Sequence, residues 1–131
     1  MKEVINKLKQ IEKKISSEKG QFLLFALFLR EDAPDLWDLM VAASWVEKDK
    51  SDSLKYISDH LKKTLDTKEL IKLSRIVLID TDNPALDALH KAIHIEHGDA
   101  EIKDSNFFGL QIKHAYVITA KPEKAPDKGI E

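Results

Sequence analysis

The spacing of apolar residues changes several times along the chain, and each change predicts a structural element. In residues 2–18, apolar side chains recur at spacings of four, three and four residues, which predicts an amphipathic helix with a narrow seam of Val4, Leu8, Ile11 and Ile15. Gly20 stands where this helix is expected to stop. So narrow a seam suits either one face of a sheet or a partner helix.

Two apolar stretches after this helix predict a β-hairpin. Residues 22–29 are apolar on both faces, which favours a central strand, although periodicity alone also allows a buried helix. The sequence EDAPD that follows predicts a turn. Residues 36–46 then alternate, which favours a second strand and leaves a helix as the alternative. The side chains on the apolar face of this stretch are Trp37, Leu39, Val41, Ala43 and Trp45.

Helices and one strand are expected in the middle of the chain. Ser51 or Ser53 can cap a helix with a stripe of leucine and isoleucine, and Thr67 can cap a short helical turn after it. The sequence RIVLID predicts a buried strand. Asn83 and Pro84 then have the residue types of an N-cap and of a first helical position, so a further helix is expected there.

The last part of the chain predicts a second hairpin and then a tail. Residues 100–120 form two arms around DSNFFG, with Leu110, Ile112, His114, Tyr116 and Ile118 on one face of the longer arm. Residues 121–131 contain two prolines and no packable run, which predicts a flexible tail. The order of elements (α-β-β-α-α-β-α-β-β) predicts a single α+β domain over residues 1–120, with mixed α/β as the alternative and one sheet of about five strands.

Composition narrows the class of protein without identifying it. The chain has 131 residues, no cysteine and a net charge of −2. The absence of cysteine excludes disulfides and thiolate sites and fits a reducing cytoplasm, which is the expected location. A near-neutral balance gives no basic face for nucleic acid, and the longest apolar run of eight residues is too short to cross a membrane. We therefore expect neither a nucleic acid nor a membrane as a partner.

Three of the five histidines lie close together in the sequence LHKAIHIEHGDAEI. On one continuous helix, Asp87, His90, His94 and His97 would fall within about 60° of one face, a spacing that can present nitrogen and carboxylate ligands to Zn²⁺. The apolar stripe of that helix lies to one side of them, and Gly98 is expected to end the helix before His97. The expectation is a solvated histidine-rich face, and these four residues are kept as metal candidates.

The sequence LIDTDNP is the first place to expect a functional site. Asp80 and Asp82 follow a strand and precede a capped helix, where carboxylates and free backbone N–H groups can bind a ligand or Mg²⁺, although ordinary N-capping explains the same residues. Asp80 with the E-x-K pair Glu101 and Lys103 is also similar to the acidic elements of Mg²⁺-dependent nucleases, except that a helix intervenes. His114 alternates with apolar residues and is either a core residue or a pocket residue.

The expected function is a non-enzymatic binding or regulatory module that contacts other proteins, because no specific catalytic motif is present and no cofactor is implied. The alternative is a small metal-dependent hydrolase or nuclease that uses Asp80, Asp82 and Glu101. The apolar seam of the first helix, shared with a second copy, predicts a homodimer. The residues expected in the core are Phe25, Leu27, Val41, Ile76, Leu78, Leu89, Ile112 and Ile118.

Overall fold

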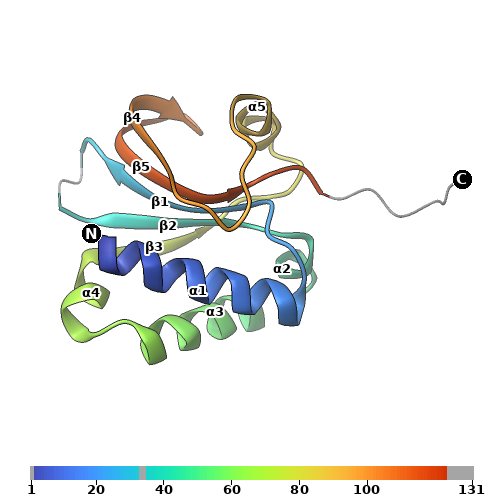
Figure 1. Cartoon of the computed structure of the whole chain (residues 1–131). Helices are drawn as coiled ribbons and strands as arrows, with labels where there is room; N and C mark the ends of the chain where they lie inside the picture. Colours follow the sequence, from blue (N-terminus) through green and yellow to red (C-terminus); the bar gives the residue numbers. More distant parts are fainter. Residues whose placement is uncertain (1, 33–34, 124–131) are drawn as a thin grey trace, which may run out of the picture.

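A computed structural model describes residues 2–32 and 35–123 and confirms an α+β fold with one mixed sheet (Figure 1). The sheet has five strands in the order β3-β2-β1-β5-β4, with β2 and β3 parallel and the other neighbours antiparallel. The elements are α1 (Lys2–Lys19), β1 (Leu24–Arg30), β2 (Trp37–Ala42), α2 (Ser44–Lys48), α3 (Lys50–Thr64), α4 (Thr67–Lys72), β3 (Leu73–Leu78), α5 (Pro84–Ala92), β4 (Ala100–Phe107) and β5 (Leu110–Ala120).

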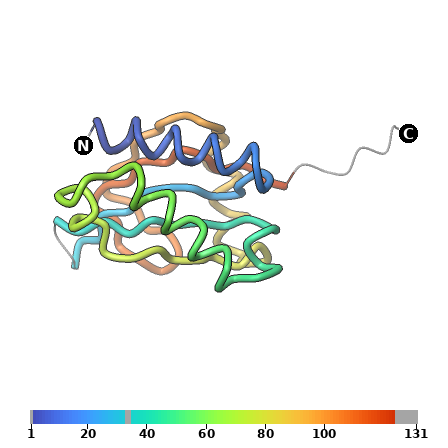
Figure 2. The backbone as a smooth tube through the Cα atoms, turned by 90° about the horizontal axis from the view of Figure 1, so that it is seen from below, coloured from blue at the N-terminus to red at the C-terminus, as the bar shows by residue number. Residues whose placement is uncertain are grey.

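Helices cover both faces of the sheet. The first four helices lie on one face and α5 lies on the other (Figure 1). Seen from below, α1 runs along the β4–β5 side of the sheet and α3 lies beside it, toward β2 and β3 (Figure 2). Leu8 and Ile15 are 0% exposed, so the apolar seam of α1 is buried against the protein's own sheet and α3. The fold therefore uses the surface that could otherwise have paired with a second copy.

The stretch predicted as one long second strand is divided between a strand and a helix. β2 ends at Ala42 and α2 begins at Ser44. The helical alternative is therefore correct for residues 44–46, the end of the predicted stretch. Val46 is buried, while the Trp45 ring packs edge-on against Phe22 with 5.5 Å between ring centroids. A helical turn allows these adjacent side chains to reach one core, whereas a strand would point them to opposite faces.

The predicted core is confirmed except at β3. Ile76 and Leu78 are only half-buried because β3 is an edge strand, with β2 as its one neighbour. An apolar run can therefore mark a sheet edge as well as a sheet centre. The six expected core residues that are buried are Phe25, Leu27, Val41, Leu89, Ile112 and Ile118.

Two helix caps differ from those expected, and one agrees. Asp49 caps α3 through the Asp52 N–H, and Asp66 caps α4 in a capping box with Glu69, so the predicted serine and threonine caps are wrong. Carboxylates placed just before each predicted cap already satisfy these N–H groups. Asn83 caps α5 with Pro84 at the first helical position, as predicted.

The β4–β5 hairpin turns through Phe108 and Gly109, which have φ values of 56° and 73°. Positive φ at both central residues is the geometry of a type I′ turn, which matches the twist of a hairpin. The pairing of β5 with β1 shifts register between Leu29 and Arg30. Because one extra residue reverses the alternation of faces, Ile112 packs on the α5 side while Tyr116 packs on the α1 side. The five alternating residues of this arm do not share one face.

The chain continues past β5 along its own sheet. Lys121 donates its backbone N–H to the Leu23 carbonyl over 3.2 Å, at the start of the stretch predicted as a tail. Residues 124–131 of the predicted tail, and residues 33–34 of the predicted EDAPD turn, lie outside the described residues. Within residues 2–32 and 35–123, no helix is long and apolar enough to cross a bilayer.

Candidate functional site

In the turn between β3 and α5, where the sequence predicts a site, polar side chains are engaged in contacts with other parts of the fold. The Asp80 side chain is 60% exposed and pairs with Lys50 Nζ at 3.1 Å. Thr81 donates its backbone N–H and its hydroxyl to the Glu47 carboxylate, over 2.7 and 2.8 Å. The Asn83 side chain accepts from the Ala85 N–H at 2.8 Å. The polar groups of this turn therefore cap a helix and tie it to α2.

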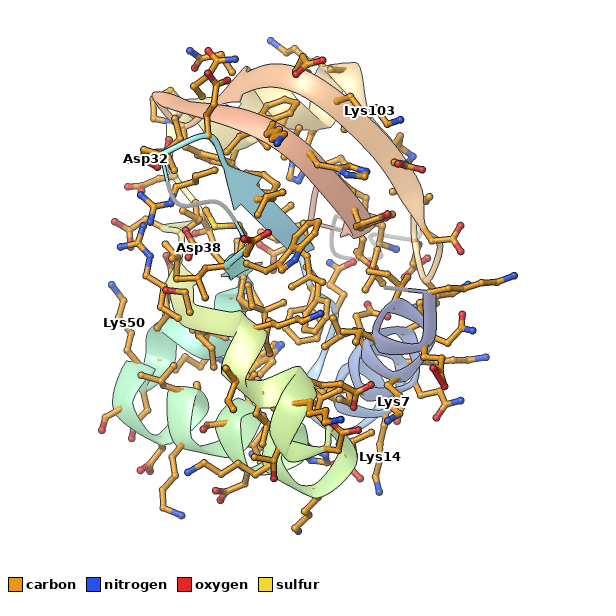
Figure 3. All side chains as sticks on the ribbon, turned by 90° about the vertical axis from the view of Figure 1, so that its left-hand side faces the viewer. Lys7, Lys14, Asp32, Asp38, Lys50 and Lys103 are labelled. Atoms are coloured by element: carbon orange, nitrogen blue, oxygen red, sulfur yellow. The ribbon has the colours of Figure 1, made fainter. Side chains whose placement is uncertain are left out.

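The three carboxylates of the hydrolase or nuclease alternative, Asp80, Asp82 and Glu101, are not brought together. Asp80 and Asp82 follow β3, whereas Glu101 and Lys103 lie on β4, and these two strands are the opposite edges of the sheet. In Figure 3, Lys103 lies on β4 at the upper right, and Lys50, the partner of Asp80, lies at the left. Among the described ranges there is no group of three His, Asp or Glu side chains placed to hold a metal ion.

The histidine-rich face predicted on the α5 helix does not form. α5 ends at Ala92, so His94 and His97 lie beyond it, and Asp87 and His90 alone share the helix. The chain after α5 pairs with the end of β5: Ile95 bridges Ala120, and Gly98 donates its N–H to the Ile118 carbonyl over 2.9 Å. His90 Nε2 lies 2.7 Å from the Leu23 carbonyl oxygen. The backbone groups of this segment are therefore satisfied by β5 instead of by further helical hydrogen bonds.

His97 belongs instead to a buried polar network. Glu12 of α1 is 0% exposed, and its Oε1 lies 2.6 Å from His97 Nδ1. The Thr119 hydroxyl of β5 donates to Glu12 Oε2 over 2.8 Å and accepts the His97 backbone N–H at 3.1 Å. Glu12 was not among the functional residues predicted from the sequence. The available signal was its place four residues after Leu8 and three before Ile15, on the buried side of the helix.

The backbone of His97 is held in an unusual conformation. Its φ is 53°, in the left-handed region that costs a residue with a side chain on the order of 1 kcal/mol. The contacts to Glu12 and Thr119 impose this geometry, and the imidazole side chain is 33% exposed. Nε2 is the outer nitrogen and lies 3.6 Å from Glu96 Oε2, which in turn pairs with Lys121 at 2.8 Å. The network therefore presents one histidine nitrogen to the surface.

Two hollows lie side by side where α1 meets the segment from His97 to β4. One has a volume of about 370 Å³ and the other about 250 Å³, and Asn6 lines both. An ion pair between Lys9 and Asp99, 3.3 Å long, lies between them. We call this surface the α1 groove. Its residues are Lys2, Ile5, Asn6, Lys9, Gln10 and Lys13 on α1, and His97, Asp99, Glu101 and Tyr116 opposite.

One end of the α1 groove is acidic and aromatic. The Glu101 carboxylate contacts His114 Nε2, so the structure brings together two residues that the sequence nominated separately. Tyr116 packs beside them, with its ring centroid 4.6 Å from that of His114 and 5.6 Å from that of Trp37. Burial, and secondarily the Glu101 charge, raises the pKa of Tyr116. His114 is therefore a half-buried neighbour of the groove residues Glu101 and Tyr116, and neither a core residue nor a lining residue of the two hollows.

A second buried carboxylate lies away from the groove. Asp38 of β2, labelled in Figure 3, is 2% exposed. The chain's two arginines converge on it. Arg75 Nε lies 3.2 Å from Oδ1, while Arg30 Nε lies 2.9 Å from Oδ2 without the alignment of a hydrogen bond. Because these residues belong to β1, β2 and β3, the cluster links three strands. Its ion pairs join the three strands at one end of the sheet, which is a structural role.

Comparison of the chain with protein-family models, with curated protein sequences and with solved structures finds no match. A function must therefore be argued from the geometry of the site itself.

Proposed function

We propose that the chain is a protein-interaction module that binds an extended segment of a partner along the α1 groove. The observation that carries the proposal is the pair of adjoining hollows between α1 and the start of β4, an edge strand of the sheet. An edge strand has a row of backbone groups without a strand partner, and binding modules use such edges to align extended peptides. The groove provides a second wall for a segment aligned in this way.

The side chains of α1 suit contact with a peptide backbone. Asn6 and Gln10 are one helical turn apart, both line the groove, and neither side chain makes a hydrogen bond to another described residue. A primary amide both donates and accepts, so it can satisfy a peptide C=O and N–H together. From Lys2 to Lys13 the helix rises about 16 Å. This is the span of about five extended residues.

We propose the cytoplasm as the location of the protein, because the chain contains no cysteine. The alternative of a metal-dependent hydrolase or nuclease has no assembled set of carboxylates to support it, because Asp80 and Glu101 lie at opposite sheet edges. The homodimer remains a prediction. Its expected interface, the α1 seam, is buried within one chain, so a dimer would have to use other residues. Light scattering at micromolar concentration measures this directly.

The proposal is tested with a phage-displayed library of random peptides of about 12 residues, longer than the groove's span. The library is panned on the full chain and on two double variants. Asn6→Ala/Gln10→Ala removes both groove amides. Lys14→Ala/Ser17→Ala is the matched control because neither residue lines the groove, and Figure 3 shows Lys14 on the side of α1 away from β4. All four substitutions replace solvent-accessible helical residues by alanine, so little change in stability is expected.

We expect enriched peptides to bind the full chain and the control equally, and the amide variant about tenfold more weakly. Two lost hydrogen bonds account for a change of that size. Peptides that bind the amide variant and the full chain alike would place the interaction elsewhere. A library that yields no binding peptide would overturn the proposal.

A further inference from the structure

We infer that the His97 end of the α1 groove is an oxyanion site, and that it takes a carboxylate or phosphate group of the bound segment. The inference rests on the proposed function for the source of the anion. The site itself rests on the larger hollow, of about 370 Å³, which is lined by Lys9, Lys13, His97 and the amides of Asn6 and Gln10. Every one of these side chains can donate a hydrogen bond, and both lysines carry positive charge.

Lys9 and Lys13 are one helical turn apart on the same side of α1. Like charges at this spacing repel each other and destabilise an isolated helix slightly. Lys9 is partly compensated by Asp99, whereas Lys13 has no ion pair with any described residue. A bound oxyanion would remove this repulsion and supply the missing counter-charge.

His97 is aimed at the same hollow by buried contacts. Because the Glu12 carboxylate accepts hydrogen bonds, Nδ1 is the nitrogen that donates to it, and Nε2 is left as the atom that gains or loses a proton. With Nε2 protonated, His97 is a further cationic donor. Glu12 does not reach the hollow itself. It is a positioning residue that orients the ring together with Thr119.

The other charged groups around His97 are already paired. Glu96 approaches Nε2 but is held by Lys121 at 2.8 Å, and Asp99 is held by Lys9. Lys13 is therefore the cation in the hollow that the fold leaves uncompensated within the described part of the chain. The charged and titratable groups that face His97 are Glu12, Lys9 and Lys13 from α1, Glu96 and Asp99 from the adjoining segment, and Lys121 after β5.

The first arm of the test uses sodium sulfate as the probe, because sulfate keeps its charge as the pH changes. Sulfate replaces chloride at constant ionic strength while ¹H–¹⁵N and histidine ring NMR signals are followed. We expect saturable shifts at His97 and Lys13. Lys13→Gln should weaken binding about threefold, the scale of one exposed ion pair. Lys14→Gln, a neighbouring lysine that does not line the hollow, is the matched control and should leave the affinity unchanged.

The role of Glu12 is tested by a pH profile. In the natural chain, sulfate affinity should fall as the pH rises, because a neutral imidazole attracts an anion less than a charged one. Glu12→Gln keeps the size of the side chain but removes the charge that orients the ring, so the dependence on pH should flatten. If the variant does not fold, the profile of Lys13→Gln, which retains His97 and Glu12, should still fall with pH. A flat profile in the natural chain would remove His97 from the site.

The second arm uses a peptide obtained by panning, in forms that carry glutamate, phosphoserine or glutamine at its anionic position. The two anionic forms should bind more tightly than the glutamine form and should compete with sulfate. Binding of sulfate at His97 with no peptide found would overturn the proposed function and leave a small-oxyanion site. Peptide binding that is insensitive to Lys13→Gln and to sulfate would overturn the oxyanion site alone.

Discussion

The β3–α5 turn and the α1 groove contain similar residue types, but they are built differently. In the turn, Asn83 caps the helix that begins beside it, and Asp80 pairs with Lys50, an exposed residue 30 positions away. In the groove, His97 meets Glu12 across 85 positions of the chain, and Thr119 meets Glu12 across 107. The polar residues clustered in sequence here cap a helix and make exposed contacts to α2 and α3. Polar residues clustered by the fold surround a hollow with donors and charges.

The largest expected difference between the two regions lies in stability. Glu12→Ala removes the partner of both His97 and Thr119 in a buried site, so we expect the free energy of unfolding to fall by about 3 kcal/mol. Urea denaturation followed by circular dichroism measures it. A loss below about 1 kcal/mol would show that water replaces the carboxylate at no great cost, and that the network does not hold His97 in place.

A smaller effect is expected from the turn, and only at its cap. Asn83→Ala should cost about 1 kcal/mol because the Ala85 N–H loses its acceptor. Asp80→Ala and Asp82→Ala should change the free energy of unfolding by no more than about 0.5 kcal/mol, since both side chains are exposed. A large change at Asp80 or Asp82 in the same denaturation experiment would contradict the view of this turn as a cap.

On the side of α1 away from the groove, Lys7 Nζ donates a hydrogen bond to Glu69 of α4 over 2.8 Å. The effect of this ion pair on stability should depend on pH. The hydrogen bond from Lys7, and then one from the Asp66 N–H, lowers the pKa of Glu69 below its ordinary value of 4.5. A lowered folded-state pKa contributes stability above the unfolded-state value, and this contribution is lost as the pH falls through the folded-state value.

The measurement compares urea midpoints of the natural chain and Glu69→Gln. We expect the natural chain to be slightly more stable at neutral pH and the difference to shrink below a pH of about 4.5. The sulfate-induced shifts at His97 should be the same in both proteins, because Glu69 lies on the side of α1 away from the groove. A difference that grows on acidification would have the wrong sign for this ion pair.

The smallest expected effect is that of metal ions. Zn²⁺ or Mg²⁺ should leave the melting temperature nearly unchanged, because neither the turn carboxylates nor the dispersed histidines form a ligand set among the described residues. A site occupied at a hundred times its dissociation constant would add about 2.7 kcal/mol and would be plain in a thermal scan. A clear shift with Zn²⁺ that His90→Ala and His94→Ala abolish would restore the metal hypothesis.

Some features of the candidate site were accessible from sequence and others were not. His114 and Glu101 were each named, because alternation and an E-x-K pair drew attention to them, but nothing in the sequence joined them. His97 was predicted to lie on the face of a helix, but that helix ends at Ala92. The competing interaction was the pairing of residues 95–98 with β5, a contact over about 20 positions that periodicity does not report.

The sequence by itself determined the class of fold, the amphipathic helix at the start of the chain, the Asn83 cap and most of the core, because these follow from local propensity and from the period of apolar residues. Only the tertiary structure decided that β3 is an edge strand, that β5 changes face at a bulge, and that Glu12 is buried beneath His97. These outcomes depend on which distant strands become neighbours. A carboxylate on a helix is buried or solvated according to what packs over it, and that is settled when α1, the segment around His97 and β5 meet.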